Sequence, residues 1–331
     1  MTVILTQPEV RALLPMRDCM DLMATTLESL ARGAGTNPLR WPMWLPDKRG
    51  LIGMMPGLSG EPEALGLKVV AVFPGNHGSQ LDSHQGVVLL FDPDNGVPIA
   101  IIDASEVTAI RTAAVSGMVT ERLSRVGASV LAILGTGVQA RTHLQAMSEA
   151  RSLSEVRVYS RSAENRARFV ERASADFDFP VRATDSGEEA VRGSHIVCTV
   201  TSSREPVLLG SWLEPGMHIN AAGSSVKFAR ELDTQAMVRC RLFVDRREST
   251  VNEAGDFLMP LQEGAIDETH IVAEIGEVLL GTHPGRESDE DITLFKSLGL
   301  AVEDLAAAHH VLERARAEGV GARAALGGRT E

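Results

Sequence analysis

Residues 128–140 read Ala-Ser-Val-Leu-Ala-Ile-Leu-Gly-Thr-Gly-Val-Gln-Ala. A run rich in Val, Leu and Ile ends in Gly-x-Gly-x-x-Ala, and a helical pattern follows, which is typical of a buried parallel strand that turns tightly into a helix N-terminus. Gly135 permits the turn, Gly137 lets a pyrophosphate approach the backbone, and Ala140 lets the helix pack close to the strand. Free N–H groups at the helix N-terminus also favour phosphate. The pattern predicts a dinucleotide site formed by Gly135, Thr136, Gly137, Val138 and Gln139.

The next predicted strand, residues 155–160, decides which dinucleotide is expected. Its tip meets the adenosine ribose, where an acidic residue selects NAD and an arginine accommodates the 2′-phosphate of NADP. The tip reads Ser160-Arg161-Ser162 and has no acid, so we predict NADP(H), held by a guanidinium and two hydroxyls. Two alternatives stay open. Glycine-rich turns also occur in α/β proteins that bind no nucleotide, and Arg161 can be a solvated residue beside an N-cap Ser162.

More short strands are predicted downstream, at residues 180–184, 195–200, 218–223 and 241–245. Helical patterns separate most of them, and this alternation predicts an α/β fold with a doubly wound parallel sheet of the Rossmann type. Ligands of such sheets bind at the carboxyl ends of the strands. Thr199, Val200 and Thr201 lie at one of these ends, so we predict that they contact the cofactor.

Composition bounds the remaining possibilities. A length of 331 residues favours two domains, and a net charge of −12 argues against nucleic acid as the main partner, although solubility alone explains that charge. Cys19, Cys198 and Cys240 are widely separated and form no C-x-x-C pair, which favours a reducing compartment and no metal. No signal-peptide pattern and no apolar run of membrane-spanning length are apparent. We therefore expect a cytoplasmic protein without a membrane partner.

The N-terminal third is expected to be mixed. Residues 6–33 are predicted helical, with a capping box at Thr6-Gln7-Pro8-Glu9 and a stop at Gly33. Residues 38–102 are predicted to form strands and turns, including a hairpin turn at 92–96. Ser105 is predicted to cap a helix that runs to Glu121. A further helix is predicted from about residue 302 to residue 318.

Three cations in this N-terminal part lie in otherwise uncharged surroundings. They are Arg40 in Pro-Leu-Arg-Trp-Pro, Lys68 in Gly-Leu-Lys-Val-Val and Arg111 in Ala-Ile-Arg-Thr-Ala-Ala. A cation within an apolar strand needs an anionic partner, because burial without one is costly. A substrate carboxylate would serve as that partner. The alternative is three separate side chains whose charged ends reach solvent.

Several short motifs then carry a family resemblance: Gly66-Leu-Lys-Val-Val, Pro74-Gly-Asn76, Ser83-His-Gln-Gly86, Thr108-Ala-Ile-Arg-Thr-Ala-Ala114, Gly135-Thr-Gly-Val-Gln139, His218-Ile-Asn-Ala-Ala-Gly223 and Phe295-Lys-Ser-Leu-Gly-Leu-Ala-Val-Glu-Asp304. Together they resemble the ornithine cyclodeaminase/mu-crystallin family over nearly the whole chain. The resemblance implies a homodimer. It also implies an α+β substrate-binding and dimerisation domain built from both chain ends, residues 1–123 and 303–331, with an NADP-binding Rossmann domain, residues 124–302, inserted between them.

The resemblance also assigns site residues. Arg40, Lys68 and Arg111 would hold the carboxylate of a small imino- or amino-acid substrate, and Ser83 and His84 would lie near the nicotinamide and the substrate. Arg111 is also placed among the expected cofactor contacts.

Two departures from the family pattern bear on the reaction. The cyclodeaminases, and the alanine dehydrogenases similar to them, carry an acidic residue where this chain has Ser225. The cyclodeaminases also carry a glutamate where this chain has Gly53. A serine has little base strength near neutral pH, so oxidation of an amine would be poorly supported. Reduction of a preformed imine asks only for a hydride and a carboxylate clamp.

We therefore expect an NADPH-dependent reductase of a cyclic or N-substituted ketimine carboxylate, similar to the mu-crystallin-like members of the family. Arg40 and Arg111 would hold the carboxylate, and Lys68 would anchor it and could donate a proton. Two alternatives stay open. One is an amino-acid dehydrogenase or ornithine cyclodeaminase-type deaminase, and the other is a non-catalytic NADPH-linked ligand-binding protein.

Overall fold

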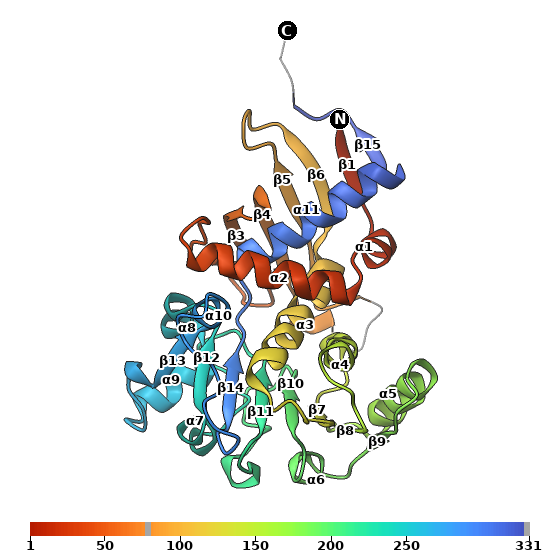
Figure 1. Cartoon of the computed structure of the whole chain (residues 1–331). Helices are drawn as coiled ribbons and strands as arrows, with labels where there is room; N and C mark the ends of the chain where they lie inside the picture. Colours follow the sequence, from red (N-terminus) through yellow and green to blue (C-terminus); the bar gives the residue numbers. More distant parts are fainter. Residues whose placement is uncertain (77–80, 328–331) are drawn as a thin grey trace. The chain divides into compact units, whose positions relative to one another are not determined.

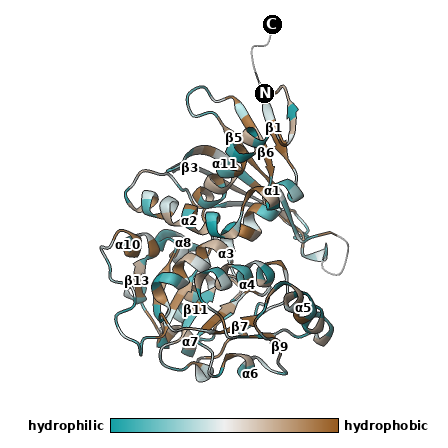
Figure 2. Ribbon diagram, turned by 45° about the vertical axis from the view of Figure 1, so that its right-hand side comes forward, coloured by the Kyte–Doolittle hydropathy of each residue, from teal (hydrophilic) through white to brown (hydrophobic). Residues whose placement is uncertain are grey.

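The glycine-rich turn follows strand β7 (Val130–Leu134), an inner strand of an eight-stranded sheet in the computed structural model, which describes residues 1–76 and 81–327. The other strands of this sheet are β8 (Glu155–Tyr159), β9 (Val181–Ala183), β10 (Ile196–Thr199), β11 (His218–Ala221), β12 (Arg241–Val244), β13 (Ile271–Glu274) and β14 (Thr293–Lys296). Every pair of neighbouring strands is parallel. Parallel strands are covered on both faces and are therefore apolar along their length, as Figure 2 shows for β7.

The strand order of this sheet is β13-β12-β14-β11-β10-β7-β8-β9. The chain runs from β7 outward to β9 and then returns to β10 on the other side of β7. This reversal makes the carboxyl ends of β7 and β10 a topological switch point, where open α/β sheets bind ligands. The predicted α/β, doubly wound Rossmann fold is confirmed.

Helices connect these strands. They are α4 (Val138–Ala150), α5 (Ala163–Asp176), α6 (Gly187–Val191), α7 (Thr234–Arg239), α8 (Arg247–Glu253), α9 (Gly255–Gln262) and α10 (Ile275–Leu279), with short 3₁₀ helices at Gly210–Trp212 and Glu268–His270. Leu134, Val197, Ile219, Leu242 and Leu294, from five different strands, share one buried core. This core fixes the sheet on which the cofactor turn is built.

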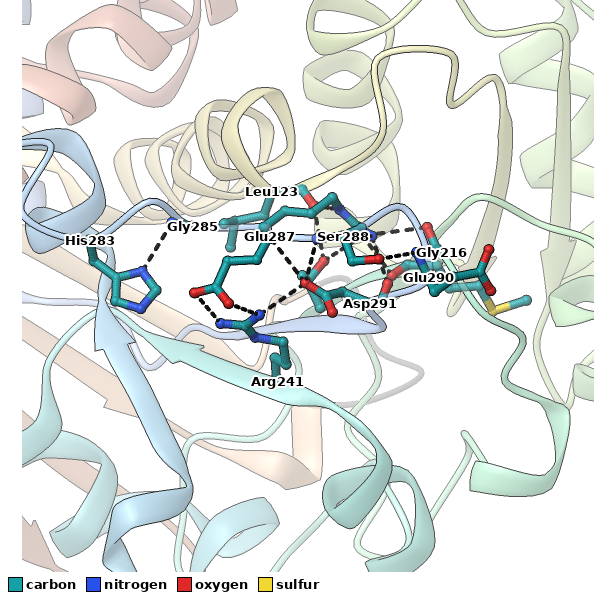
Figure 3. Close-up of polar contacts among 12 residues, drawn as sticks. Leu123, Gly216, Arg241, His283, Gly285, Glu287, Ser288, Glu290 and Asp291 are labelled. Carbon is teal, nitrogen blue, oxygen red and sulfur yellow. Dashed lines mark hydrogen bonds and ion pairs between the residues drawn. The ribbon is translucent and has the colours of Figure 1, made fainter.

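The strand β14 was not predicted as a strand, and it lies between β11 and β12. The loop before it is held by several charged contacts, and Ile292, directly before the strand, is part of the buried apolar core. Arg241 pairs with Glu287 at 2.8 Å and with Asp291 at 3.1 Å (Figure 3). Arg286 donates to the backbone carbonyls of Leu123 and Asp291, both at 2.6 Å. These contacts bring a strand that is late in the sequence into the middle of the sheet.

A second sheet has seven strands in the order β15-β1-β6-β5-β4-β3-β2. The strands are β1 (Thr2–Leu5), β2 (Trp41–Trp44), β3 (Leu51–Gly60), β4 (Glu63–Val72), β5 (His84–Phe91), β6 (Pro98–Asp103) and β15 (Ala322–Ala324), and a 3₁₀ helix spans Pro74–Asn76. The helices α1 (Gln7–Leu13), α2 (Met16–Ala31) and α11 (Ala301–Glu318) pack on one face of this sheet, with α2 and α11 side by side (Figure 1).

The N-terminal predictions need two corrections. The region predicted as one helix over residues 6–33 is two helices, because Pro15 separates α1 from α2. The predicted capping box is present, and the Thr6 N–H donates to the Glu9 carboxylate at 2.7 Å. Helix α3 (Ala104–Leu123) is capped by Asp103 rather than by Ser105, since the Asp103 carboxylate accepts the Glu106 N–H at 2.9 Å.

The chain divides into two compact units. Unit 1 comprises residues 1–111 and 299–331, and unit 2 comprises residues 112–298. The division falls within α3, whereas the sequence placed a boundary at residues 123/124. In the part of the chain that the structure describes, no helix is long and apolar enough to cross a membrane.

Candidate substrate and cofactor sites

Unit 1 contains a buried cluster of charged side chains from three elements. Lys68 comes from β4, Arg111 from α3, and Glu303 and Asp304 from the first turn of α11. The Lys68 Nζ lies 3.0 Å from both carboxylate oxygens of Asp304. Arg111 donates through Nε to Asp304 and through Nη1 to Glu303, both at 2.8 Å. The structure therefore brings two of the three predicted cations together through acids to which the sequence analysis gave no role.

Burial sets the electrostatics of this cluster. Lys68 and Arg111 are 3% and 4% exposed, and both acids are fully buried. Burial lowers the pKa of Lys68 to about 8, although the negative charge of Asp304 opposes this effect. Burial by itself raises the pKa of Asp304, but the charges of Arg111 and Lys68 outweigh burial and hold that pKa below its ordinary value. Asp304 therefore remains a carboxylate, while Lys68 can lose its proton close to physiological pH.

Arg40 joins the cluster at Gly299, just before α11. Its Nη2 donates to the Gly299 carbonyl at 3.1 Å. A Cβ on Gly299 would lie 2.5 Å from the nearest guanidinium nitrogen of Arg111, and Gly299 has a φ of +77°. A residue without a side chain is therefore needed where the two arginines meet. Three cations and two carboxylates are thus gathered in one part of unit 1, and cations in such a group can bind the carboxylate of a ligand.

Ser83 and His84 stand at the start of β5. The Ser83 Oγ and the His84 Nδ1 are 3.0 Å apart, and His84 is exposed. Lys68 pairs with Val88 across β4 and β5. His84 lies four residues before Val88 on the same strand, so it belongs to the Lys68 face of the sheet.

The two departures from the family pattern are also placed. Gly53 lies on β3 opposite Val70, two residues from Lys68 on β4, and therefore on the Lys68 face. The three atoms nearest to a Cβ there belong to the Val70 side chain, the Val70 carbonyl and the Leu51 side chain, at 3.4–3.9 Å, which is ordinary van der Waals contact, so the backbone has room for a Cβ. Ser225 is half-buried in the loop after β11.

In unit 2, the glycine-rich turn has the geometry that its sequence predicts. Gly135 has a φ of +129°, and a Cβ on it would lie 2.7 Å from the Val200 carbonyl at the end of β10. Gly137 is the N-cap of α4 and is exposed, and among the described residues nothing beyond its own chain neighbours lies within 4 Å of the position of a Cβ. Ala140 is fully buried. The open backbone at Gly137, in front of a helix N-terminus, fits the pyrophosphate of a dinucleotide.

The tip of β8 completes the cofactor side. The Thr136 Oγ1 donates to the Ser160 Oγ at 3.3 Å, which links the glycine-rich turn to the tip. Arg161 is exposed. Ser162 is the N-cap of α5, and its Oγ accepts the Asn165 N–H at 3.2 Å. The capping role that was left open for Ser162 is therefore present, and its hydroxyl proton remains able to donate to a phosphate.

Glu231, which the sequence analysis missed, joins the ends of β10 and β11. It is fully buried, and it accepts from the hydroxyls of Thr199 and Thr201, both at 2.8 Å, and from the Gly223 N–H at 2.8 Å. Burial, together with the charge of Asp256, raises the pKa of Glu231. The side chains of Thr199 and Thr201 thus face Glu231. Any contact of Thr199 with the cofactor is left to its backbone, whereas Val200 packs beside Gly135.

Comparison with known proteins places the chain among nicotinamide-dependent enzymes. The sequence model of the ornithine cyclodeaminase/mu-crystallin family matches residues 1–319. The chain is 43% identical to the ketimine reductase mu-crystallin of Mus musculus over 281 residues, which is 85% of this chain and 86% of the relative.

Two solved structures are similar in fold. The Thermococcus litoralis Delta(1)-pyrroline-2-carboxylate reductase in complex with NADH and L-proline has a TM-score of 0.95 and 37% identity, over 98% of this chain and all of the other. An archaeal alanine dehydrogenase dimer with bound NAD has a TM-score of 0.91 and 33% identity, over 97% of this chain and 98% of the other.

Proposed function

The chain belongs to the ornithine cyclodeaminase/mu-crystallin family, and we propose that it reduces a cyclic or N-substituted ketimine carboxylate to the corresponding amino acid with NADPH. Relatives named for ketimine and pyrroline-2-carboxylate reduction support the wider class, an NAD(P)H-dependent oxidoreductase acting on C=N bonds. We assign substrate binding and dimerisation to unit 1 and cofactor binding to unit 2.

The observation that carries the proposal is the charge cluster in which the buried Lys68 and Arg111 share the carboxylate of Asp304, with the half-buried Arg40 beside them at Gly299. Arg40 and Arg111 hold the substrate carboxylate through charge-assisted hydrogen bonds. Lys68, fixed by Asp304, anchors the same carboxylate and keeps the imine nitrogen protonated. Ser83 and His84, at the start of β5, would complete the substrate site. Holding the carboxylate fixes the imine carbon in position, which removes much of the entropic cost of reaction.

The reaction starts from a protonated imine, whose positive charge is neutralised when the hydride adds. A nicotinamide cofactor bound at the glycine-rich turn would supply the hydride that the imine carbon accepts. The C=N π-electron pair moves to the nitrogen, whose positive charge is neutralised while its proton is retained. No group has to remove a proton from an amine in this direction. The absence of carboxylates at Gly53 and Ser225 therefore favours reduction over deamination.

The cofactor assignment depends on the tip of β8. A serine, an arginine and a second serine follow Tyr159, so the tip offers a cation and two hydroxyls to a 2′-phosphate. Gly135 to Gln139 would bind the pyrophosphate, and Val200 with the backbone of Thr199 and Thr201 would border the nicotinamide half. The two similar structures contain NADH and NAD, respectively. The preference of this chain for NADPH over NADH is therefore the finer part of the proposal.

We also propose that a second copy of this chain covers the outer face of the unit 1 sheet. The strand register places this face opposite to the one that carries Lys68. It presents ten apolar side chains that are half-buried or exposed: Ile4, Trp41, Met43, Ile52, Met54, Leu67, Val69, Val87, Leu89 and Ile101. An apolar face of this extent favours burial, and one similar structure is a dimer. A Leu89→Lys variant should sediment as a monomer in analytical ultracentrifugation.

The test is NADPH oxidation, followed spectrophotometrically, with a panel of cyclic ketimine carboxylates, with NADH run in parallel. Rapid oxidation with NADPH preferred is the expected result. Activity with equal or better use of NADH would overturn the cofactor assignment alone. No reduction across the panel, with ammonia released from ornithine or alanine, would replace the reductase by a deaminase or dehydrogenase. Tight NADPH binding without turnover on any of these substrates would favour a binding protein.

A further inference from the structure

Arg166 lies beside the tip of β8 but played no part in the sequence argument. It is the fourth residue of α5, and its Nη1 donates to the Ser160 carbonyl at 2.6 Å. Its guanidinium carbon stands 5.6 Å from the centre of the Tyr159 ring. The side chain is only 14% exposed. The guanidinium is therefore already ordered at the strand tip, where the adenosine ribose of a dinucleotide would bind.

The charges around Arg166 leave it able to take another anion. Its Nη2 is 3.8 Å from the Asp185 carboxylate, which is beyond hydrogen-bond distance, and the Asp185 side chain is fully exposed. A solvated ion pair of this kind contributes little to the stability of the fold. Arg166 also lies in the first turns of α5, where the helix dipole disfavours a cation unless an anion is close by. A doubly charged phosphate at the tip would pair with the guanidinium more strongly than Asp185 does. It would also supply the negative charge that the helix N-terminus favours.

We propose that Arg166 is a second arginine for the 2′-phosphate of NADPH, beside Arg161, and that it determines cofactor specificity. This inference rests on the NADPH preference proposed above. Arg161 is exposed and has to be ordered when the cofactor binds, whereas Arg166 is held beforehand by the Ser160 carbonyl and the Tyr159 ring. Preorganised guanidinium groups lose less conformational freedom for each hydrogen bond formed.

The experiment measures binding of two cofactor fragments to the full chain by isothermal titration calorimetry. One fragment is 2′,5′-ADP, which carries the 2′-phosphate, and the other is 5′-AMP, which does not. The variants are Arg166→Met, Arg166→Lys and, as a matched control, Arg168→Met. Arg168 is on the same helix and carries the same charge, but it donates to Asn165 at 2.6 Å and pairs with Glu164 at 3.7 Å.

We expect Arg166→Met to weaken 2′,5′-ADP binding roughly 10- to 100-fold, the usual effect of losing a charge-assisted hydrogen bond. Binding of 5′-AMP should change less than about twofold. Arg166→Lys should recover part of the loss, and Arg168→Met should leave both ligands unchanged. With Arg166→Met, KM for NADPH should rise while kcat at saturating NADPH and all NADH parameters stay near wild type.

Two outcomes would overturn the inference alone. One is a wild-type preference for 2′,5′-ADP that survives Arg166→Met, and the other is an equal loss for both fragments, which would mean that Arg166 only supports the fold of the tip. A wild-type chain that binds 2′,5′-ADP no better than 5′-AMP would instead overturn the proposed NADPH preference, and this inference with it.

Discussion

The two candidate sites are built in opposite ways. The cofactor turn of unit 2 consists of successive residues, Gly135 to Ala140, and it acts through backbone geometry and a helix N-terminus. The cluster of unit 1 consists of side chains from distant parts of the chain, since Lys68 and Arg111 are 236 and 193 positions from Asp304. A backbone site depends on the absence of side chains, whereas a charge cluster depends on each of its members. The two sites should therefore fail differently when they are altered.

The largest effect is expected from Arg111→Met. This change removes one contact to the substrate carboxylate, and it also removes the guanidinium that donates to the buried carboxylates of Asp304 and Glu303. We expect kcat/KM for the ketimine to fall at least about 1,000-fold, and the free energy of unfolding to fall by about 3–5 kcal/mol. Steady-state kinetics and urea denaturation measure the two effects. Arg316→Met, at an exposed pair with Glu313 on α11, is the matched control and should change neither.

A double variant separates stability from binding. Adding Glu303→Gln to Arg111→Met neutralises a buried carboxylate to which Arg111 had donated, so much of the lost stability should return. The activity should not return, because a neutral amide supplies no cation to the substrate. Recovery of activity together with stability would show that Arg111 has only a structural role and would break the contrast between the two sites.

The glycine-rich turn should give a smaller effect that depends on which glycine is changed. Gly135→Ala places a methyl group 2.7 Å from the Val200 carbonyl at a φ of +129°, so we expect it to cost about 2–4 kcal/mol of stability. At Gly137 the φ is −84°, and in the described part of the chain an added methyl group meets nothing within 4 Å beyond its neighbours in sequence, so Gly137→Ala should cost less than about 1 kcal/mol. It should still weaken NADPH at least tenfold, because its methyl group occupies the path of the pyrophosphate. Thermal unfolding and NADPH titration distinguish the two variants.

The same contrast explains what was predictable from the sequence. The turn at Gly135 was recognised because its requirements are local, and the structure shows both the positive φ at Gly135 and the open space at Gly137. The strands on either side of it were also found. The cations Lys68, Arg40 and Arg111 stood out because each interrupts an apolar segment. Their meeting at Asp304 and Gly299 was not predictable, since it depends on how α11 packs on β3 and β4.

Other features were hidden for comparable reasons. The strand β14 has four residues and ends in Lys296, and a lysine argues against a buried strand. In the structure Lys296 is fully buried and pairs with Asp256 at 2.9 Å. The buried position of Glu231 could not be predicted from the sequence, because a single acid in a loop is ordinarily solvated. The break at Pro15 was a local feature that could have been predicted, since proline seldom continues a helix, and so was the N-cap at Asp103.

The two sites should also differ in their pH dependence, since kcat/KM for reduction should vary with pH and the Kd of NADPH should not. Burial lowers the pKa of Lys68 to about 8, and the protonated form, which is present below that pKa, is the form that serves as anchor and proton source. Above pH 8, each further pH unit lowers the fraction of protonated Lys68 by up to tenfold. We therefore expect kcat/KM for reduction to fall on the alkaline side. A Lys68→Met variant should be slow and should lack this alkaline limb. The Kd of NADPH should stay flat from pH 7 to 9.5, because arginines do not titrate in that range. A Lys68→Met profile with an unchanged limb would assign it to another group.

The smallest effect is expected at Asp185, and it tests whether the cofactor tip is also governed by charge. Asp185 is fully exposed and lies 3.8 Å from Arg166, so solvent and salt screen most of its influence. Asp185→Asn should strengthen 2′,5′-ADP binding by about two- to fivefold, because a negative charge near the 2′-phosphate is removed and Arg166 is left to the ligand. The gain should shrink at 1 M salt, and 5′-AMP binding should not change. Weaker 2′,5′-ADP binding by Asp185→Asn would mean that the carboxylate holds Arg166 in its binding position, so that the tip, like the cluster of unit 1, depends on an acid to order its cation.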